Sequence, residues 1–242
     1  MATAIRCLAA TYHDGFHIKP HRHHWGQLIY AGSGVMRVRS GGTVWIVPPA
    51  RAVWVPAGTD HEIHGLGDFA MRTLYLPVEM TATLPGQCCA LDVTPLLREL
   101  TLELVEWCPV DEADAVGMRL AEVAIDRIAE ARMLPLQLPL PRDPRALRLA
   151  ARLQAEPSAQ AKLSELAADA GASERTIQRL FLSETGMGFS QWRQRLRLLH
   201  GATLLGGGAS VTEAGLEAGY SGTSAFIAAF RKHFGFTPSK LG

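Results

Sequence analysis

Hydrophobic and polar residues follow two different periods along this chain. Up to about Leu76, short runs rich in β-branched and aromatic residues are separated by turn residues such as Gly32-Ser33-Gly34 and Gly41-Gly42. Runs of this kind are typical of β-strands that turn alternate side chains toward a core. The predicted strands cover residues 27–31, 35–39, 43–47, 52–55 and 71–76. Their spacing predicts a small all-β barrel or jelly roll over residues 1–80.

Helical spacing of apolar residues replaces this alternation after residue 80. One stripe, made of Leu97, Leu100 and Leu104, predicts a helix over residues 95–107. A second helix is predicted over residues 113–131, with Leu120, Val123, Ala124 and Ile128 on its apolar stripe. Two roles are open for these helices: they cover the barrel, or they form a dimer contact. Residues 81–134 are therefore predicted to be a helical cover or dimerisation region.

The segment that follows alternates leucine and proline from Pro135 to Pro144. Proline lacks the backbone donor that a helix needs, so this segment is predicted to be an extended, fairly stiff linker over residues 135–144. The domain boundary is expected here.

The last eighty residues have the pattern of two consecutive helix-turn-helix units. In the first unit a helix over residues 163–170 stops at Gly171, and Ser173 caps a second helix over residues 174–185. The second unit repeats this construction with residues 211–218, a turn at Gly219-Tyr220-Ser221-Gly222, and residues 223–234. Small residues are expected at the two helix crossings, namely Ala167, Ala170, Ala214 and Gly215. Such a unit presents its second helix to the major groove of DNA.

The outward-facing residues of the two second helices differ in chemistry. Arg175, Thr176, Gln178 and Arg179 lie on the outer face predicted for the first unit. Arginine and glutamine can bind guanine and adenine edges through two hydrogen bonds, so this face is predicted to contact bases. The second unit offers the short side chains Thr223 and Ser224, with Arg231 and Lys232 further along to reach phosphates. We expect the first unit to carry more sequence information than the second.

Several motifs of this segment resemble the DNA-binding domain of the AraC/XylS family of transcription regulators. The resemblance rests on residues 225–238 (AFIAAFRKHFGFTP), on Gln178-Arg179-Leu180-Phe181 and on Glu184-Thr185-Gly186. It implies a DNA-binding domain over residues 145–242, in which one long helix, here residues 191–205, joins the two units. It also implies action on double-stranded DNA together with RNA polymerase. Gly206-Gly207-Gly208 predicts a loose second junction, because glycine weakens a helix.

The charge distribution agrees with a chain of two parts. The net charge is +1 overall, but residues 1–144 hold 12 basic and 16 acidic side chains, whereas residues 145–242 hold 12 and 7. The basic part is the one predicted to bind DNA. Its excess is modest, so groove fit and dimerisation are expected to matter beside electrostatic attraction.

Seven of the nine histidines lie between His13 and His64, and their spacing carries a second resemblance. His21-x-His23 followed by Gln27 resembles the first cupin motif, and Pro56-x-Gly58-x-x-His61 resembles the second. The resemblance implies that His21, His23, Gln27 and His61 converge inside the barrel. Three imidazoles can hold a divalent metal, although Gln27 stands where a carboxylate ligand is usual. The alternative is that these residues hydrogen-bond a small-molecule effector, or are structural.

The predicted fold class is thus α+β: an N-terminal cupin-like β-barrel, then helices, then an all-α double helix-turn-helix domain. The predicted function is that of a ligand-responsive, sequence-specific DNA-binding transcription regulator, acting as a homodimer. The alternative is a metal-dependent cupin enzyme, similar to a dioxygenase, fused to a DNA-binding module; turnover would distinguish the two. The four cysteines form no CxxC pair, and neither a signal peptide nor a membrane-spanning run is apparent, so a reduced, cytoplasmic protein is expected.

Overall fold

The computed structural model describes residues 5–241, which separate into two compact units. The first unit comprises the chain up to Gly41 together with Trp45–Leu136. The second comprises Gly42–Val44 and the chain from Gln137 onward. The chain leaves the first unit at Leu136, within the segment expected to be the linker. No helix between residues 5 and 241 is both long and apolar enough to cross a membrane.

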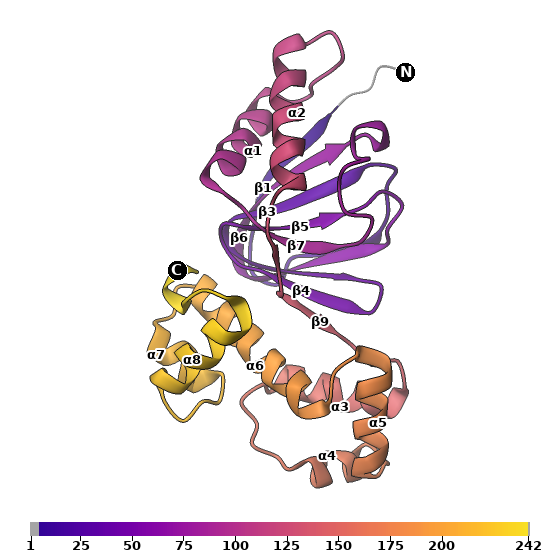
Figure 1. Cartoon of the computed structure of the whole chain (residues 1–242), viewed down its shortest axis with the longest axis vertical. Coiled ribbons are helices and arrows are strands. Elements are labelled where there is room, and N and C mark those ends of the chain that lie inside the picture. Colours follow the sequence, from indigo (N-terminus) through magenta and orange to yellow (C-terminus); the bar gives the residue numbers. More distant parts are fainter. Residues whose placement is uncertain (1–4, 242) are drawn as a thin grey trace. The chain divides into compact units, whose positions relative to one another are not determined.

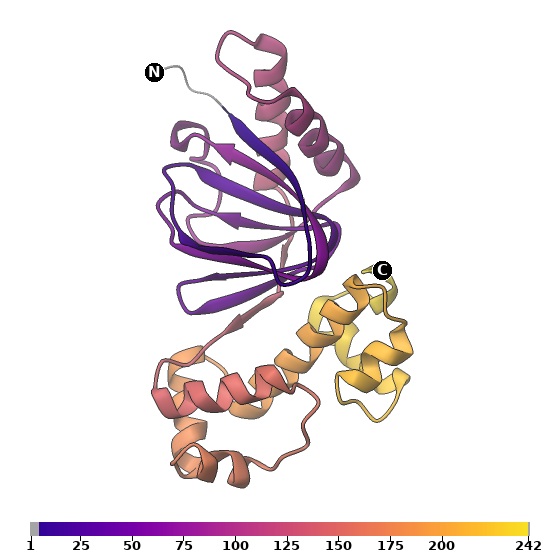
Figure 2. The same cartoon turned by 180° about the vertical axis from the view of Figure 1, so that it is seen from behind.

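The first unit is built on an antiparallel sheet whose strands differ in length. Its strands are β1 (Arg6–Tyr12), β2 (His17–His21), β3 (Gly26–Ser40), β4 (Thr43–Val47), β5 (Arg51–Val55), β6 (His61–Leu76), β7 (Cys89–Asp92) and β8 (Met133–Leu134), and β9 (Gln137–Pro139) pairs with β4. The strand order is β1-β6-β3-β5-β7-β8, with β2 also on β6 and β4 also on β3. The barrel prediction needs correction, because within the described residues the two ends of this order do not pair and the sheet is not closed. Helices cover apolar residues of the sheet instead (Figures 1 and 2).

Two long strands, β3 and β6, form the centre of the sheet and pair along most of their length. Residues 32–34 were expected to be a turn, but they continue β3, and the register shifts between Ala31 and Val35. Gly34 has φ +67°, and a Cβ atom there would overlap the carbonyl oxygen of Asp68. The glycine is therefore required by a bulge inside the strand and by the close approach of β6.

The helices of the first unit are α1 (Pro95–Trp107) and α2 (Ala115–Ala129), and a short 3-10 helix, η1 (Val78–Met80), precedes them. The predicted stripe of α1 is buried as expected. The stripe of α2 was partly wrong: Val123 is exposed, while Ala121 and Ile125 are buried. One apolar core joins these helices to the sheet, with Leu28, Trp54, Leu74, Leu97, Leu104, Ala124 and Ile128 among its members.

A disulfide joins Cys7 in β1 to Cys108, the residue that follows α1. The expectation that all the cysteines are free thiols is corrected for this pair. Sequence spacing could not reveal it, because the two residues are 101 positions apart and meet only when β1 packs beside α1. Cys88 and Cys89 are free and half-buried, and burial raises the pKa of the Cys89 thiol to about 11.

The second unit is helical. It contains α3 (Pro144–Ala155), α4 (Leu163–Asp169), α5 (Glu174–Thr185), α6 (Phe189–Gly206), α7 (Val211–Glu217), α8 (Thr223–Phe234) and the 3-10 turn η2 (Pro238–Lys240). The helices predicted from 163 to 234 are confirmed. Helix α3 was not predicted; Pro144, expected to end the linker, is its first residue, a position where the missing donor costs nothing. Of residues 135–143, only Gln137–Pro139 form a strand, β9, and because it pairs with β4 the segment is not a free spacer.

The junction before α7 is more ordered than its three glycines suggested. Gly206 ends α6, Gly208 takes φ +95°, and the backbone N–H of Ala209 donates to the carbonyl of Leu204. This closure satisfies carbonyls at the end of the helix, as a left-handed residue at a C-terminus commonly does. The glycines thus make a tight cap rather than a loose link.

Candidate histidine site and nucleic-acid interface

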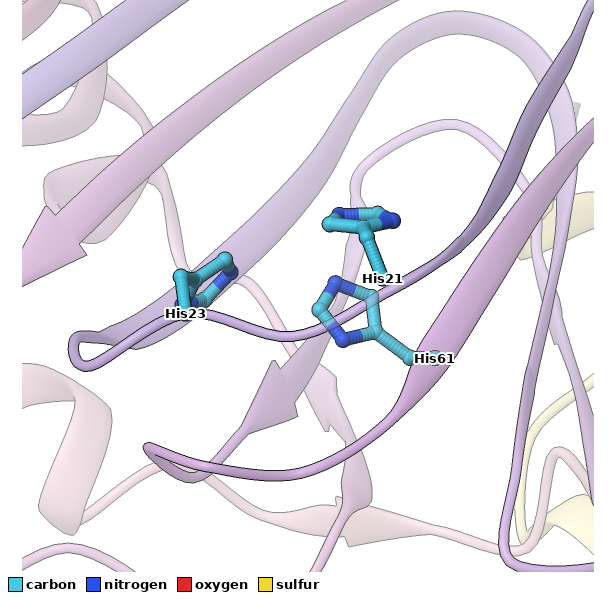
Figure 3. Close-up of side chains that lie close together, drawn as sticks. All are labelled: His21, His23 and His61. Carbon is cyan, nitrogen blue, oxygen red and sulfur yellow. The ribbon is translucent and has the colours of Figure 1, made fainter.

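Three histidines predicted to converge do so on one side of the sheet. His21 at the end of β2 lies opposite His61 at the start of β6, and His23 lies in the following loop. Figure 3 shows the three rings gathered from these two segments. One nitrogen of each ring lies within 4.8 Å of the others. His61 is buried, and that burial lowers its pKa to about 4, so its imidazole is neutral at pH 7.

Each ring is fixed by a backbone carbonyl within two residues of it. Nδ1 of His21 lies 2.8 Å from the carbonyl oxygen of Lys19. Nδ1 of His23 lies 2.7 Å from that of Trp25, and Nδ1 of His61 lies 2.9 Å from that of Thr59. A carbonyl can only accept, so each Nδ1 carries the proton. The other nitrogen, Nε2, then holds a free lone pair in a neutral ring.

Gln27 in β3 lies at the centre of this cluster and is 1% exposed. Its Oε1 is 3.0 Å from Nε2 of His23 and 2.9 Å from Nε2 of His61. Its Nε2 donates to Oγ1 of Thr73 at 2.9 Å, and that hydroxyl donates to the carbonyl of Leu28 at 2.8 Å. The amide is therefore held with its oxygen toward the histidines.

The contacts around Gln27 lack a proton in the orientation described. Oε1 of Gln27 accepts only, and so does Nε2 of a neutral imidazole, so neither atom brings a proton to the short distances between them. Turning the amide by 180° would let its NH2 group donate to both rings and its oxygen accept from Thr73, whose hydroxyl would then no longer donate to the carbonyl of Leu28. A cation between the lone pairs also satisfies these atoms, and it keeps that bond.

The donor set fits a divalent transition metal. In a six-coordinate site, metal bonds of about 2.0–2.2 Å place neighbouring ligands roughly 2.8–3.1 Å apart, and the two measured separations lie within this range. Imidazole suits zinc, copper, nickel and iron. The three Nδ1–H···O=C contacts are of the kind that orients metal-bound histidines. The residues present thus fit a metal, with a neutral amide in place of a carboxylate.

Two neighbours of this site were missed by sequence reasoning. Thr73 orients Gln27, and the ring of Tyr75 meets His23 edge-on at 5.2 Å. Only the register of β3 on β6 brings them there, and no local motif signals it. Of the nearby tryptophans, Trp54 is in the core under α1 and α2, and the ring of Trp25 lies beneath the guanidinium of Arg6.

The outer face predicted for α5 is the one the structure exposes. Arg175, Gln178 and Arg179 are exposed and Thr176 is half-buried, while Ile177, Leu180 and Phe181 form the buried stripe. Ser173 caps the helix by accepting from the backbone N–H of Thr176 at 3.2 Å. The left-handed Gly171 and the buried Ala167 and Ala170 make the turn and the crossing that bring α4 against α5.

In the second helix-turn-helix, α8 exposes polar side chains that are, near its start, shorter than those of α5. Ser224, Arg231 and Lys232 are exposed, whereas Thr223 donates to the hydroxyl of Thr212 in α7 at 3.2 Å. The crossing depends on Gly215, since a Cβ atom there would lie 3.0 Å from Cβ of Phe226. The small residue expected at this crossing thus makes room for a fully buried aromatic ring.

Some arginines of the helical unit form hydrogen bonds within that unit. Arg193 and Arg197 on α6 donate to the backbone carbonyls of Pro157, Ala159 and Ala161, which tie the α3–α4 loop to α6. Within the described residues, Arg175 and Arg179 on α5 and Arg231 and Lys232 on α8 make no such bond. Glu184 at the end of α5 also acts internally, accepting from the backbone N–H groups of Arg142 and Asp143.

Known proteins match both units. Residues 3–120 match the sequence model of the AraC-like ligand binding domain, and residues 166–242 match that of a helix-turn-helix domain. The HTH-type transcriptional regulator NimR of Escherichia coli is 33% identical over 220 residues, which cover 91% of this chain and 80% of that protein. The HTH-type transcriptional regulator RipA of Corynebacterium glutamicum is 40% identical over 115 residues, covering 48% of this chain and 34% of that protein.

Among solved structures, fatty-acid-bound ToxT from Vibrio cholerae aligns with 98% of this chain and 94% of its own, at 8% identity and a TM-score of 0.40. A similarity this low supports no conclusion about fold or ligand. The match to the regulator NimR, by contrast, spans both units of this chain, and one family sequence model lies on each unit.

Proposed function

Because the chain belongs to the AraC family of transcription regulators, we propose that its DNA binding is controlled by a divalent metal at His21, His23, Gln27 and His61. The protein is a DNA-binding regulator with a ligand-binding N-terminal domain. The alternative of a cupin enzyme is set aside, because the relatives that match both units are regulators.

The observation that carries the metal proposal is the convergence of one nitrogen from each of His21, His23 and His61 within 4.8 Å, with Oε1 of Gln27 beside two of them. An organic effector would need to donate several protons into a space about 3 Å across, between Gln27 and two rings. A single divalent ion can contact these acceptor atoms at the same time. The neutral ligand set leaves a net charge of +2 at a buried position, so an anion or a hydroxide is expected to complete the shell.

On DNA, we assign base contacts to the exposed side chains of α5. Arg175, Gln178 and Arg179 can each form two hydrogen bonds to a base edge, and Thr176 can contact a thymine methyl group. Arg231 and Lys232 on α8 are assigned to phosphates, with Thr223 and Ser224 near the groove. This division follows the charge and length of the side chains that each helix exposes.

The experiment that tests the DNA-binding proposal is selection of duplexes from a randomised library, followed by hydroxyl-radical footprinting. Two recognition helices joined by α6 are expected to protect two stretches about 10 base pairs apart on one face of the DNA. Protection of a single groove per monomer would show that the second helix-turn-helix does not bind the DNA.

The metal proposal is tested separately by zinc binding. The purified chain is stripped with a chelator and titrated with zinc, for wild type and His61→Ala. Loss of one equivalent in the variant is the expected result. A variant that binds as much zinc as wild type would place the metal elsewhere or nowhere.

We also propose that the active form is a homodimer that contacts RNA polymerase in the cytoplasm, where its DNA target lies. Support for the dimer comes from exposed apolar side chains on α1 and α2, namely Leu96, Trp107, Val116 and Val123. Apolar side chains exposed together often mark a protein interface. Sedimentation of Val116→Glu against wild type tests it, since a charge in a dimer contact would favour the monomer.

A further inference from the structure

A second group of histidines lies on the other face of the same two strands. His17 of β2 pairs directly with His64 of β6, and Glu62 precedes His64 by two residues. Residues two apart on a strand share a face, so Glu62 and His64 point away from the buried His61. Arg37 and Arg39 of β3 lie opposite His64 and Glu62, respectively.

The donor atoms of this group converge on one carboxylate oxygen. Oε2 of Glu62 is 3.1 Å from Nε2 of His17 and 3.5 Å from Nε2 of His64. One ligand atom of each residue lies within 4.8 Å of the others. The edge of a tetrahedron with metal bonds of about 2.0–2.2 Å is roughly 3.3–3.6 Å long; the separation from His64, 3.5 Å, lies within it, and that from His17, 3.1 Å, is slightly shorter.

The other oxygen of the carboxylate is held by a cation. Oε1 of Glu62 is 3.1 Å from Nη1 of Arg39, so Oε2 is left for the histidines. A charged partner of this kind fixes the orientation of a ligating carboxylate. The positive charge of Arg39 also repels a bound cation, and Arg37 adds a second positive charge on the same face. Because Arg37 lies opposite His64, its charge acts on that ring directly.

The rings must adjust for both lone pairs to meet one ion. They are stacked with centroids 3.7 Å apart and planes 14° from parallel. Two parallel rings cannot both direct in-plane lone pairs at a single point between them. His17 has the more exposed side chain of the two, so its rotation costs less than that of His64. Solvent reaches the group and can supply a fourth ligand.

We propose that His17, Glu62 and His64 form a second divalent-metal site of the zinc or copper class on the outer face of the sheet. Two imidazoles, one carboxylate and one water make an open four-ligand set of a kind that zinc accepts. A metal here would clamp β2 to β6, the strands that carry His21 and His61 to the inner site. The outer site uses no residue of the inner one, so it stands or fails independently of the proposed function.

Zinc stoichiometry tests this proposal. Equilibrium dialysis of the chelator-stripped, full-length chain compares wild type, His64→Ala, His61→Ala and the double variant, with circular dichroism to check folding. His13→Ala is the matched control, because His13 is an exposed histidine that pairs only loosely with Asp68, at 3.6 Å. We expect two zinc ions in wild type and the control, one in each single variant, and none in the double variant.

The outcomes separate the two sites. If His61→Ala loses an ion and His64→Ala does not, the outer site is overturned and the inner site stands. If only His64→Ala loses an ion, the inner site fails and the outer one stands. Should His64→Ala misfold, Glu62→Gln replaces it and is expected to weaken zinc binding at least tenfold, since an amide is the poorer ligand. With copper, electron paramagnetic resonance of His61→Ala is expected to show nitrogen coupling, and its absence would also overturn the outer site.

Discussion

Thr73 is the residue through which the proposed sensor site can be weakened without touching a ligand. It is fully buried, accepts from Nε2 of Gln27 and donates to the carbonyl of Leu28. Thr73→Val removes both bonds at nearly constant volume. One lost bond costs about 1 kcal/mol, and the stranded Gln27 amide costs about 1–3 kcal/mol more. We therefore expect the free energy of unfolding of the metal-free protein to fall by about 2–4 kcal/mol.

The same change should weaken metal binding, because the amide is no longer held with its oxygen toward the rings. Loss of such an orienting partner typically lowers affinity about 10- to 100-fold. Competition with a chromophoric chelator measures this in a His64→Ala background, which removes the outer site. Thr101→Val is the matched control, since Thr101 is equally buried and donates to Leu97 within α1.

The control should lose about 1 kcal/mol of stability and no zinc affinity. Thr73→Ser, which keeps the hydroxyl, should recover most of the affinity. A Thr73→Val protein that is folded and binds zinc within twofold of its parent would refute the proton accounting around Gln27.

Three further predictions concern DNA binding and stability. Arg179→Ala should cost about 1–3 kcal/mol on the selected duplex and relax preference at one base, whereas Lys232→Ala should weaken selected and scrambled duplexes alike, as measured by fluorescence anisotropy. Equal losses on both duplexes for Arg179→Ala would remove its base contact. Cys7→Ser, which breaks the link to Cys108, should lower the free energy of unfolding by up to about 4 kcal/mol under oxidising conditions and hardly at all in a reductant, measured by urea denaturation. Phe226→Ala should lower the free energy of unfolding of the helical C-terminal unit by about 3–5 kcal/mol. An unchanged melting temperature of that unit would contradict the packing described.

The helices of the DNA-binding unit could be predicted because their signals are local. Ser173, Gly171 and the apolar stripe of α5 lie within fifteen residues of one another, and each has a direct steric or hydrogen-bonding reason. The histidine cluster was also predictable, since two motifs fixed which residues converge. Its proton balance was not, because that depends on Thr73, which reaches Gln27 only through the pairing of β3 with β6.

Features that depend on the pairing of residues far apart in the chain could not be predicted from the sequence. Strand β2 carries Pro20 and three polar residues, so it shows no strand pattern, yet it pairs with β6 and brings His17 onto His64. Where β3 pairs with β5 the sheet is buried on both faces, and alternate residues such as Leu28, Trp54 and Leu74 pack under α1 and α2, a contact that strand patterns alone do not reveal. The face of α2 was misassigned because alanine, valine and isoleucine in succession give its helix two apolar stripes, and only packing selects one.

The measurement that tests the central claim most directly is the affinity of the full chain for its selected duplex, with and without saturating zinc, in wild type and His61→Ala. Coupling between two sites is commonly worth about 1–3 kcal/mol, so zinc should change the wild-type affinity about 5- to 150-fold and leave the variant unchanged. Equal wild-type affinities in the two conditions, with zinc shown to be bound, would contradict control of DNA binding by the histidine site.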